Sequence, residues 1–210
     1  MESSPDSLAP SRPDRTGRPD HAGRPDRGGR GARERILRAA ADLFYADGIN
    51  TTGMERLTEA AHVSKRTFYQ HFPSKAALVE AYLRGQQPNG EQTLYRDDLS
   101  PRDRLLGLFT ERAATEGRIR GCPFHNAAVE TAGALPEVQA EVVRHKQEFA
   151  ARLIETARAA GARDPERLGR QLAVLFEGTK ALSTSLNDGC PAGDARQAAS
   201  TLIDAAMTGE

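Results

Sequence analysis

The 210-residue sequence is poor in cysteine and has no long apolar run. Its two cysteines, Cys122 and Cys190, are too few and too far apart to predict a disulfide framework or a zinc site. No stretch reaches the roughly 20 apolar residues that a membrane-spanning helix needs. The N-terminal MESSPDSLAPSRPD lacks a basic start followed by an apolar run, so it does not predict a secretory signal. We therefore expect a cytoplasmic protein with no metal, cofactor or membrane partner.

Net charge is also lacking, because 29 basic side chains balance 29 acidic ones. Residues 33–84 hold eight Lys and Arg against six Asp and Glu, a net of +2, whereas residues 85–210 carry a net of −3. The asymmetry is mild, so a nucleic-acid partner has to be argued from the local placement of charge.

Residues 1–32 are of low complexity, with Arg-Pro-Asp recurring at Arg12, Arg18 and Arg24. Leu8 is the only large aliphatic residue, so this segment cannot bury a core and is predicted to be a disordered tail. Its six Arg nearly balance five acids. A solvated tail is the simpler interpretation, and a contact with DNA is the alternative.

Helical periodicity begins near Arg33 and predicts four helices up to residue 84. Gly48 is placed to end the first helix, and Thr52 with Glu55 reads as a capping box that opens the second. Ser64 can cap a third helix that Pro73 ends, and Ser74 can cap a fourth that runs through Tyr82. The segment GQQPNG, residues 85–90, marks a domain boundary.

The remainder is helical by the same signals. Helices are predicted after Ser100-Pro101, from Cys122-Pro123 to near Gly133, from Pro136 to Gly161, after Asp164-Pro165, and from about Gly193 to Met207. No strand is credible, so the predicted fold class is all-α.

The segment SKRTFYQHFPSKAALV, residues 64–79, carries an unusual density of hydrogen-bonding and cationic groups. Phe68 and Phe72 lie four residues apart and would face inward. Two short helices joined by a tight turn are the plan of a helix-turn-helix, whose second helix enters the major groove and needs such an exposed face. Lys75, at the start of the next helix, is placed to hold a phosphate. A merely solvated polar face is the alternative.

The run ILRAAADLFYADGINTTGMERLTEAAHVSKRTFYQHFPSKAALVEAYL, residues 36–83, resembles the TetR-type one-component transcriptional repressors. The resemblance implies a homodimeric, cytoplasmic, non-enzymatic regulator. It also implies a helix-turn-helix DNA-binding domain at residues 33–84. Residues 85–210 would form a ligand-binding and dimerisation domain whose last two helices make the dimer interface.

Carried over position by position, the resemblance predicts the DNA-binding residues. These are Thr52, Ser64, Lys65, Arg66, Thr67, Tyr69, Gln70, His71 and Lys75. At Arg66 the family frequently has Gly or Pro, so a bidentate contact to guanine and a contact along a phosphate both remain open. Tyr69 could instead pack against the first helix, and His71 could be a structural hydrogen-bonding residue.

The segment RIRGCPFHNAAVE, residues 118–130, is the most chemically loaded part of the second half. Cys122 is expected at a helix N-terminus after Arg118 and Arg120, where the helix dipole and cations favour a thiolate, with His125 close by. A similar Gly-Cys-x-x-x-Asn pattern occurs in electrophile-sensing members of the family. The alternative is a buried cysteine that only packs. A Cys/His hydrolase is not supported, because no orienting Asn or Asp can be identified.

A pocket for a mostly apolar small molecule is predicted among the C-terminal helices. Its candidate lining is Phe109, Cys122, Phe124, His125, Asn126, His145, Phe149, Phe176 and Thr179. His145 and Thr179 could equally be satisfied core residues. The Leu168–Leu186 seam and the small-residue helix after it are expected to form the dimer interface, with a private core as the alternative.

The sequence thus predicts a ligand-released repressor that binds an operator of double-stranded DNA as a homodimer. A protein-interaction adaptor that keeps the helix-turn-helix shape and a ligand-independent regulator are the alternatives.

Overall fold

The computed structural model describes residues 27–88, 90–110 and 119–207 of the chain. Within these ranges the chain is helical and contains no strand. The N-terminal part holds α1 (Arg27–Asp47), α2 (Met54–Ala60), α3 (Lys65–His71) and α4 (Lys75–Arg84). The remainder holds the 3₁₀-helix η1 (Glu91–Tyr95), α5 (Pro101–Gly107), α6 (Pro123–Thr131), α7 (Pro136–Ala159), α8 (Pro165–Leu186) and α9 (Pro191–Met207). The predicted all-α fold class is confirmed.

Most helix starts follow the local signals in the sequence. The side chains of Ser64, Ser74 and Ser100 each accept a hydrogen bond from the backbone N–H three residues later, and Asp164 does the same for α8. These caps satisfy N–H groups that have no partner inside the helix. Gly48 ends α1 with a φ of 97°, a left-handed conformation that costs glycine little.

The predicted capping box is wrong, and two helices begin earlier than expected. The capping box at Thr52 does not form, since Gly53 is the N-cap of α2 and makes no side-chain cap. Helix α1 begins at Arg27, so the last six residues of the predicted tail are helical, while residues 1–26 lie outside the described ranges. Helix α9 begins two residues early, at Pro191, because proline suits a first helical turn. The 3₁₀-helix η1 was not foreseen.

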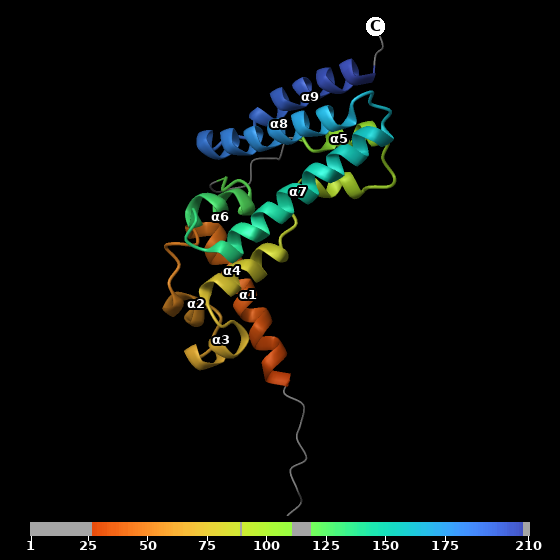
Figure 1. The fold of residues 1–210 in the computed structure, drawn as a ribbon. Helices are drawn as coiled ribbons and strands as arrows, with labels where there is room; N and C mark the ends of the chain where they lie inside the picture. The colour runs from red at the N-terminus through yellow and green to blue at the C-terminus, as the bar shows by residue number, and fades with distance from the viewer. Residues whose placement is uncertain (1–26, 89, 111–118, 208–210) are drawn as a thin grey trace, which may run out of the picture.

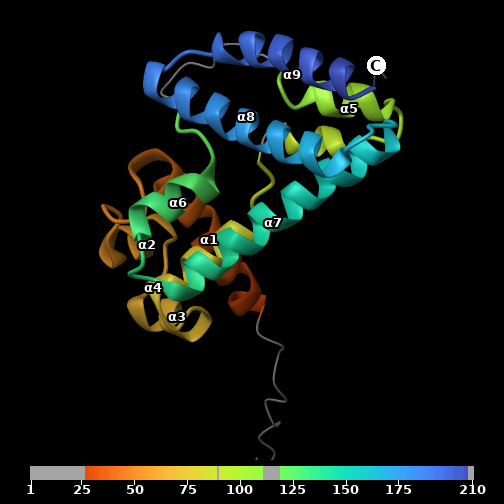
Figure 2. The same ribbon diagram turned by 45° about the horizontal axis from the view of Figure 1, so that its top comes forward.

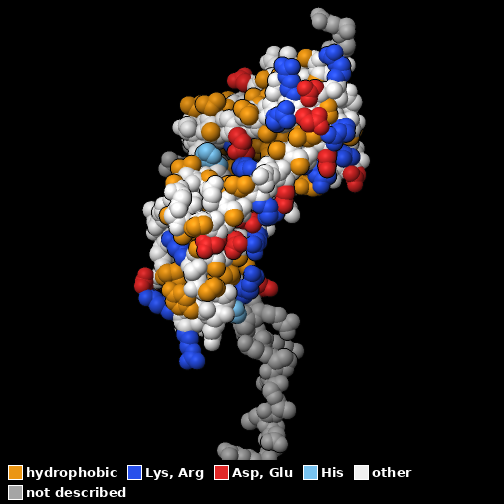
Figure 3. Space-filling model, viewed as in Figure 1, with side chains coloured by type: hydrophobic (Ala, Val, Ile, Leu, Met, Phe, Trp, Pro, Cys, Tyr) orange, Lys and Arg blue, Asp and Glu red, His pale blue; other side chains and the backbone are white. Residues whose placement is uncertain are grey.

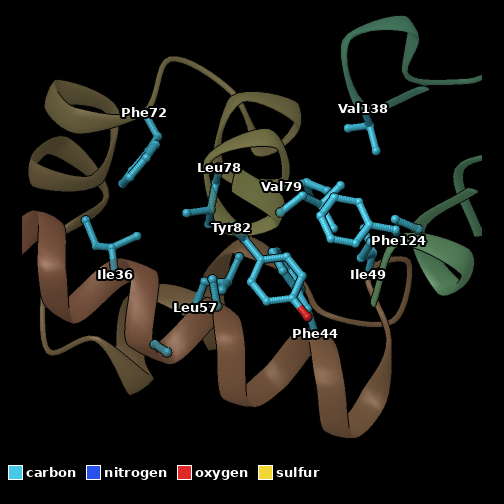
Figure 4. Packing of buried hydrophobic residues seen from close by; sticks show 14 of the residues in the cluster. Ile36, Phe44, Ile49, Leu57, Phe72, Leu78, Val79, Tyr82, Phe124 and Val138 are labelled. Atoms are coloured by element: carbon cyan, nitrogen blue, oxygen red, sulfur yellow. The ribbon is translucent and has the colours of Figure 1, made fainter. Parts of the chain in front are cut away.

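The first hydrophobic core joins the two predicted domains. Ile36, Leu57, Phe68 and Leu78, from the four N-terminal helices, are fully buried in it. The same core takes Phe124 from α6 and Val138 from α7, and Figure 4 shows these two side chains facing Val79 of α4. The hydrophobic core of the N-terminal helices therefore extends across the predicted domain boundary near residue 85. Residues of α6 and of the start of α7 complete it.

The second core lies between η1, α5 and the last three helices. Phe109, Phe149 and Phe176 pack on one another in it, with ring centroids 6.1 Å apart for Phe109–Phe176 and 5.2 Å apart for Phe149–Phe176. Leu153 and Leu172 are fully buried beside them. Burial of this kind contributes about 25 cal/mol per Å² of apolar surface.

Helix α7 links the two ends of the molecule. Figures 1 and 2 show α1 to α4 at one end, α8 and α9 at the other, and α7 running between them with α6 near the middle. No helix in the described ranges is long and apolar enough to cross a membrane.

Candidate DNA-binding surface and effector cavity

The polar face predicted on α3 is exposed. Lys65, Arg66, Tyr69 and Gln70 are exposed, and their spacing places them on one side of the helix. Phe68 and Phe72 are buried on the opposite side, as predicted. Tyr69 is 52% exposed, and its ring meets the Phe68 ring edge-on with centroids 5.4 Å apart.

The start of α3 is fixed by its own side chains. Ser64 Oγ accepts a hydrogen bond from the Thr67 N–H at 3.0 Å and lies 2.9 Å from Thr67 Oγ1. Lys65 forms an exposed ion pair of 2.5 Å with Glu55 of α2. The Lys65 ammonium holds the pKa of Glu55 below its ordinary value, and Glu55 raises that of Lys65. Exposed pairs are weak, so a phosphate can compete for Lys65.

The remaining predicted contacts differ in accessibility. His71 and Lys75 are half-buried, and burial lowers the pKa of the Lys75 ammonium. Thr52 is fully buried, and its hydroxyl donates to the Gly48 carbonyl at 2.7 Å. Thr52 therefore stabilises the turn between α1 and α2. It has no exposed surface for a DNA contact, in contrast to the expectation from the sequence.

Arg33 of α1 is exposed and packs beside the end of α3, a contact that the sequence pattern does not predict. Its guanidinium lies over the Phe72 ring, 5.3 Å from the centroid, and so beside the end of α3. The contact joins residues on two helices far apart in sequence, which no local periodicity can reveal. Figure 3 shows Lys and Arg side chains at this end of the molecule, where α2 and α3 lie.

The predicted effector residues divide into two groups. Cys122, His125 and Asn126 line a cavity of about 300 Å³ between α6 and α8. The rest of its lining is Arg120, Val129, Glu130, Lys180, Ala181, Thr184 and Ser185. The aromatic lining expected from Phe109, Phe149 and Phe176 is wrong, because these rings fill the second core.

The other three predicted lining residues are likewise engaged in packing. Phe124 stacks on the His145 ring with centroids 3.6 Å apart, and His145 Nε2 lies 3.4 Å from the buried carboxylate of Glu91. Thr179 donates to the Leu175 carbonyl of its own helix at 2.7 Å. His145 and Thr179 are thus satisfied structural residues, the alternative that the sequence left open.

Cys122 is buried, and its sulfur lies 3.6 Å from the Lys146 ammonium. Lys146 also pairs with Glu177 at 2.5 Å. Burial would lower the pKa of Lys146, but Cys122 and Glu177 outweigh it and raise that pKa. Arg118, the other cation expected near the thiol, lies outside the described residues. Redox or electrophile sensing by Cys122 stays a hypothesis.

Glu130 of α6 is hydrogen-bonded to the turn after α1, a set of contacts that the sequence did not predict and that we call the Glu130 clamp. Glu130 of α6 accepts hydrogen bonds from the backbone N–H groups of Ile49 and Asn50, at 2.5 and 3.1 Å. The Asn50 side-chain amide also donates to the Glu130 backbone carbonyl at 2.6 Å. A side chain at Gly48 would meet the Glu130 carboxylate at 2.8 Å. Helix α6, which lines the cavity, therefore holds the turn that leads into the helix-turn-helix.

The described residues contain no group of His, Cys, Asp and Glu arranged to hold a metal ion. A capped helix with an exposed polar face, set on a three-helix support, defines the chain as a helix-turn-helix DNA-binding protein. Residues 36–82 match the N-terminal domain of the family described as "Bacterial regulatory proteins, tetR family". The chain belongs to this family of transcription regulators, which are not enzymes.

Three similar proteins illustrate the extent of the match. The transcriptional regulator AcuR of Cereibacter sphaeroides is 32% identical over 163 residues, which are 70% of this chain and 74% of AcuR. The HTH-type transcriptional regulator TcmR of Streptomyces glaucescens is 31% identical over 149 residues, which are 63% of this chain but only 60% of TcmR. A solved TetR-type regulator of Streptomyces avermitilis has a TM-score of 0.71 and 33% identity, covering 85% of this chain and 99% of that one.

Proposed function

We propose that the protein is a cytoplasmic repressor that binds a near-palindromic operator as a homodimer and is released by a small-molecule effector. The observation that carries the DNA-binding part is the outward face of α3. There four exposed hydrogen-bonding side chains stand over two buried phenylalanines on a helix capped by Ser64. Such a face fits the width of the major groove.

The roles on this face follow from chemistry and position. Arg66 and Gln70 can pair with base edges, since guanidinium and amide groups match guanine and adenine in the major groove. Lys65, Lys75 and Arg33 supply cations for phosphates, which position the helix without reading sequence. Ser64, Thr67, Tyr69 and His71 complete the proposed interface.

The homodimer is proposed to form through α8 and α9. Val174, Gly178, Leu182 and Leu186 follow one another at four-residue spacing along α8, and all four are exposed. Val174 is 74% exposed and Leu182 54%, which is costly for large apolar side chains facing water. On α9 the small residues Ala198, Thr201 and Ala205 are exposed at helical spacing. A second copy of the chain would cover both faces.

Release is proposed to pass through the Glu130 clamp. The cavity and the clamp share the Glu130 side chain, so a molecule that binds the cavity acts on the turn before α2. An effector that binds more tightly when α6 is displaced would favour that conformation. The two DNA-binding ends of the dimer would then move relative to one another, and operator affinity would fall. A ligand-independent regulator needs no cavity, so the cavity between α6 and α8 is evidence against that alternative. The exposed cations of α3 are evidence against the protein-interaction adaptor.

Selection of binding sites from randomised duplex DNA tests the proposal. The expected product is a pair of inverted half-sites about one helical turn or a little more apart. Selected DNA should bind the protein tightly and with strong salt dependence. Failure to enrich any sequence would contradict the proposal and favour the protein-interaction adaptor. A pull-down that retains a protein partner at high salt would then support the adaptor.

A further inference from the structure

Among the described residues, one cation that lines the cavity between α6 and α8 has no ion-pair partner. Arg120 Nε is buried and is the one side-chain nitrogen or oxygen in the described ranges that is both buried and without a hydrogen-bond partner. Within these ranges no carboxylate lies within ion-pair distance of the Arg120 guanidinium. An unpaired buried donor costs about 1–3 kcal/mol, so its retention calls for an explanation.

The loop that carries Arg120 is held in place from three sides. The Ile119 N–H donates to Asn187 Oδ1 at 2.7 Å, and Asn126 Nδ2 donates to the Arg120 carbonyl at 2.6 Å. Gly121, with a φ of 73°, packs so closely on α8 that a Cβ would meet Thr184 Oγ1 at 2.4 Å. The backbone that carries Arg120 is therefore held in place by the fold.

Cationic and apolar side chains in the remaining walls suit a small organic anion. Lys180 adds a second cation, with its ammonium over the Phe176 ring at 4.9 Å from the centroid. Val129 and Ala181 supply apolar surface. Thr184 and Ser185 also line the cavity, but their hydroxyls donate to the Lys180 and Ala181 carbonyls, so the anion has to be held by the cations. The volume of about 300 Å³ is at the small end of the range for ligand pockets.

Among the described lining residues Glu130 is the one acid. Its Oε2 atom accepts the N–H groups of Ile49 and Asn50, and the described residues show no ion pair between Glu130 and Arg120. A ligand anion placed in the same cavity would add like charge beside Glu130. That repulsion weakens the hold of Glu130 on the turn between α1 and α2.

We propose that this cavity binds a small organic carboxylate, which pairs with the Arg120 guanidinium and packs its apolar part against Val129. Planar guanidinium matches a carboxylate through two parallel hydrogen bonds. Only the role of the carboxylate as effector rests on the proposed function. The binding of a carboxylate at Arg120 does not depend on that role.

The test is ligand-observed NMR with the full chain at constant ionic strength. The probes are matched acids and primary amides, such as benzoate with benzamide and hexanoate with hexanamide, and inorganic phosphate. The acids should bind and compete with one another, whereas the amides and phosphate should not. Absence of binding by every acid, or equal binding by the amides, would overturn the inference.

Variants locate the site. Arg120→Gln should lose carboxylate affinity by about tenfold or more, as expected when a charge-assisted pair is removed. Arg120→Lys keeps the cation and should retain part of the affinity, while Arg158→Gln, an exposed arginine on α7 paired with Glu166, should bind as the parent chain does. Circular dichroism confirms that each variant is folded. Unchanged affinity in folded Arg120→Gln would contradict the assignment.

Operator binding measured in parallel separates the two proposals. Carboxylate binding that leaves operator affinity unchanged would support the site and refute its role as effector site. Operator binding without any carboxylate binding would leave the regulator in place and refute the site.

Discussion

Asn50 donates two hydrogen bonds to Glu130, one from its backbone N–H to the Glu130 carboxylate at 3.1 Å and one from its side-chain amide to the Glu130 backbone carbonyl at 2.6 Å. The two residues are 80 positions apart in sequence. They join the turn that precedes the helix-turn-helix to the helix that lines the cavity. Under the proposed mechanism, a movement of α6 would reach the turn before α2 through these hydrogen bonds.

Replacement of Glu130 tests this link. Glu130→Ala leaves the N–H groups of Ile49 and Asn50 without their acceptor, and Ile49 is buried. The free energy of unfolding should fall by about 1–3 kcal/mol, which lowers the melting temperature by about 2–4 °C per kcal/mol. Operator binding should survive at temperatures where the variant is folded, but its response to effector should shrink. A full response in the variant would show that the signal takes another route.

Removal of the Glu55 carboxylate should strengthen DNA binding. Glu55 pairs with Lys65 on the face proposed to meet DNA, so Glu55→Gln frees the ammonium and removes a repulsive charge. Operator affinity should rise by about two- to fivefold, and the gain should shrink at high salt. Glu59→Gln, an exposed acid of α2 with no ion pair among the described residues, is the control for net charge. An equal gain in both variants would mean that only net charge matters.

The exposed stripe on α8 predicts the oligomeric state. Leu182→Glu or Val174→Glu places a charge at the proposed dimer interface and should convert the protein to monomers in sedimentation velocity. Val143→Glu, an apolar residue on α7 that is 42% exposed, should leave the dimer intact. A parent chain that sediments as a monomer, or stripe variants that remain dimers, would refute this interface.

The buried carboxylate of Glu141 predicts a pH dependence of stability. It pairs with Arg84 at 3.3 Å and with Arg144, and the Arg144 guanidinium holds the pKa of Glu141 below its ordinary value of 4.5. A pKa lowered by folding means that this stabilisation is present above about pH 4.5 and is lost as the pH falls through the folded-state pKa.

Denaturant unfolding at a series of pH values measures the effect. Glu141→Gln should cost about 1–2 kcal/mol at neutral pH, a modest figure because both arginines are half-exposed. The gap to the parent chain should close in acid. A gap that is constant down to pH 3 would show that Glu141 acts through shape and not through charge.

Signals confined to a few residues were readable from the sequence. The capping serines at 64, 74 and 100, the buried pair Phe68 and Phe72, and the exposed face of α3 all depend on neighbours within four positions. Thr52 was misassigned because its hydroxyl turns back to Gly48, and a capping pattern does not reveal such competition.

Features that join distant segments were not readable. The Glu130 clamp, the Arg33 contact with Phe72 and the cavity all require the helices to be placed in space. Phe149 and Phe176 were expected around a ligand because an apolar stripe looks the same whether it faces a pocket or a core. The residues of the predicted Leu168–Leu186 seam do not share one environment. Leu168 and Leu172 are buried in the second core, whereas Leu182 and Leu186 are exposed.

Fluorescence anisotropy with labelled DNA from the region flanking the protein's own gene tests the central claim most directly. The titration is run at several salt concentrations for the parent chain, the Arg66→Ala/Tyr69→Ala variant and the Arg158→Gln control. We predict tight, salt-sensitive and sequence-selective binding that the double variant loses and the control keeps. Selective binding retained by the folded double variant would contradict recognition by α3.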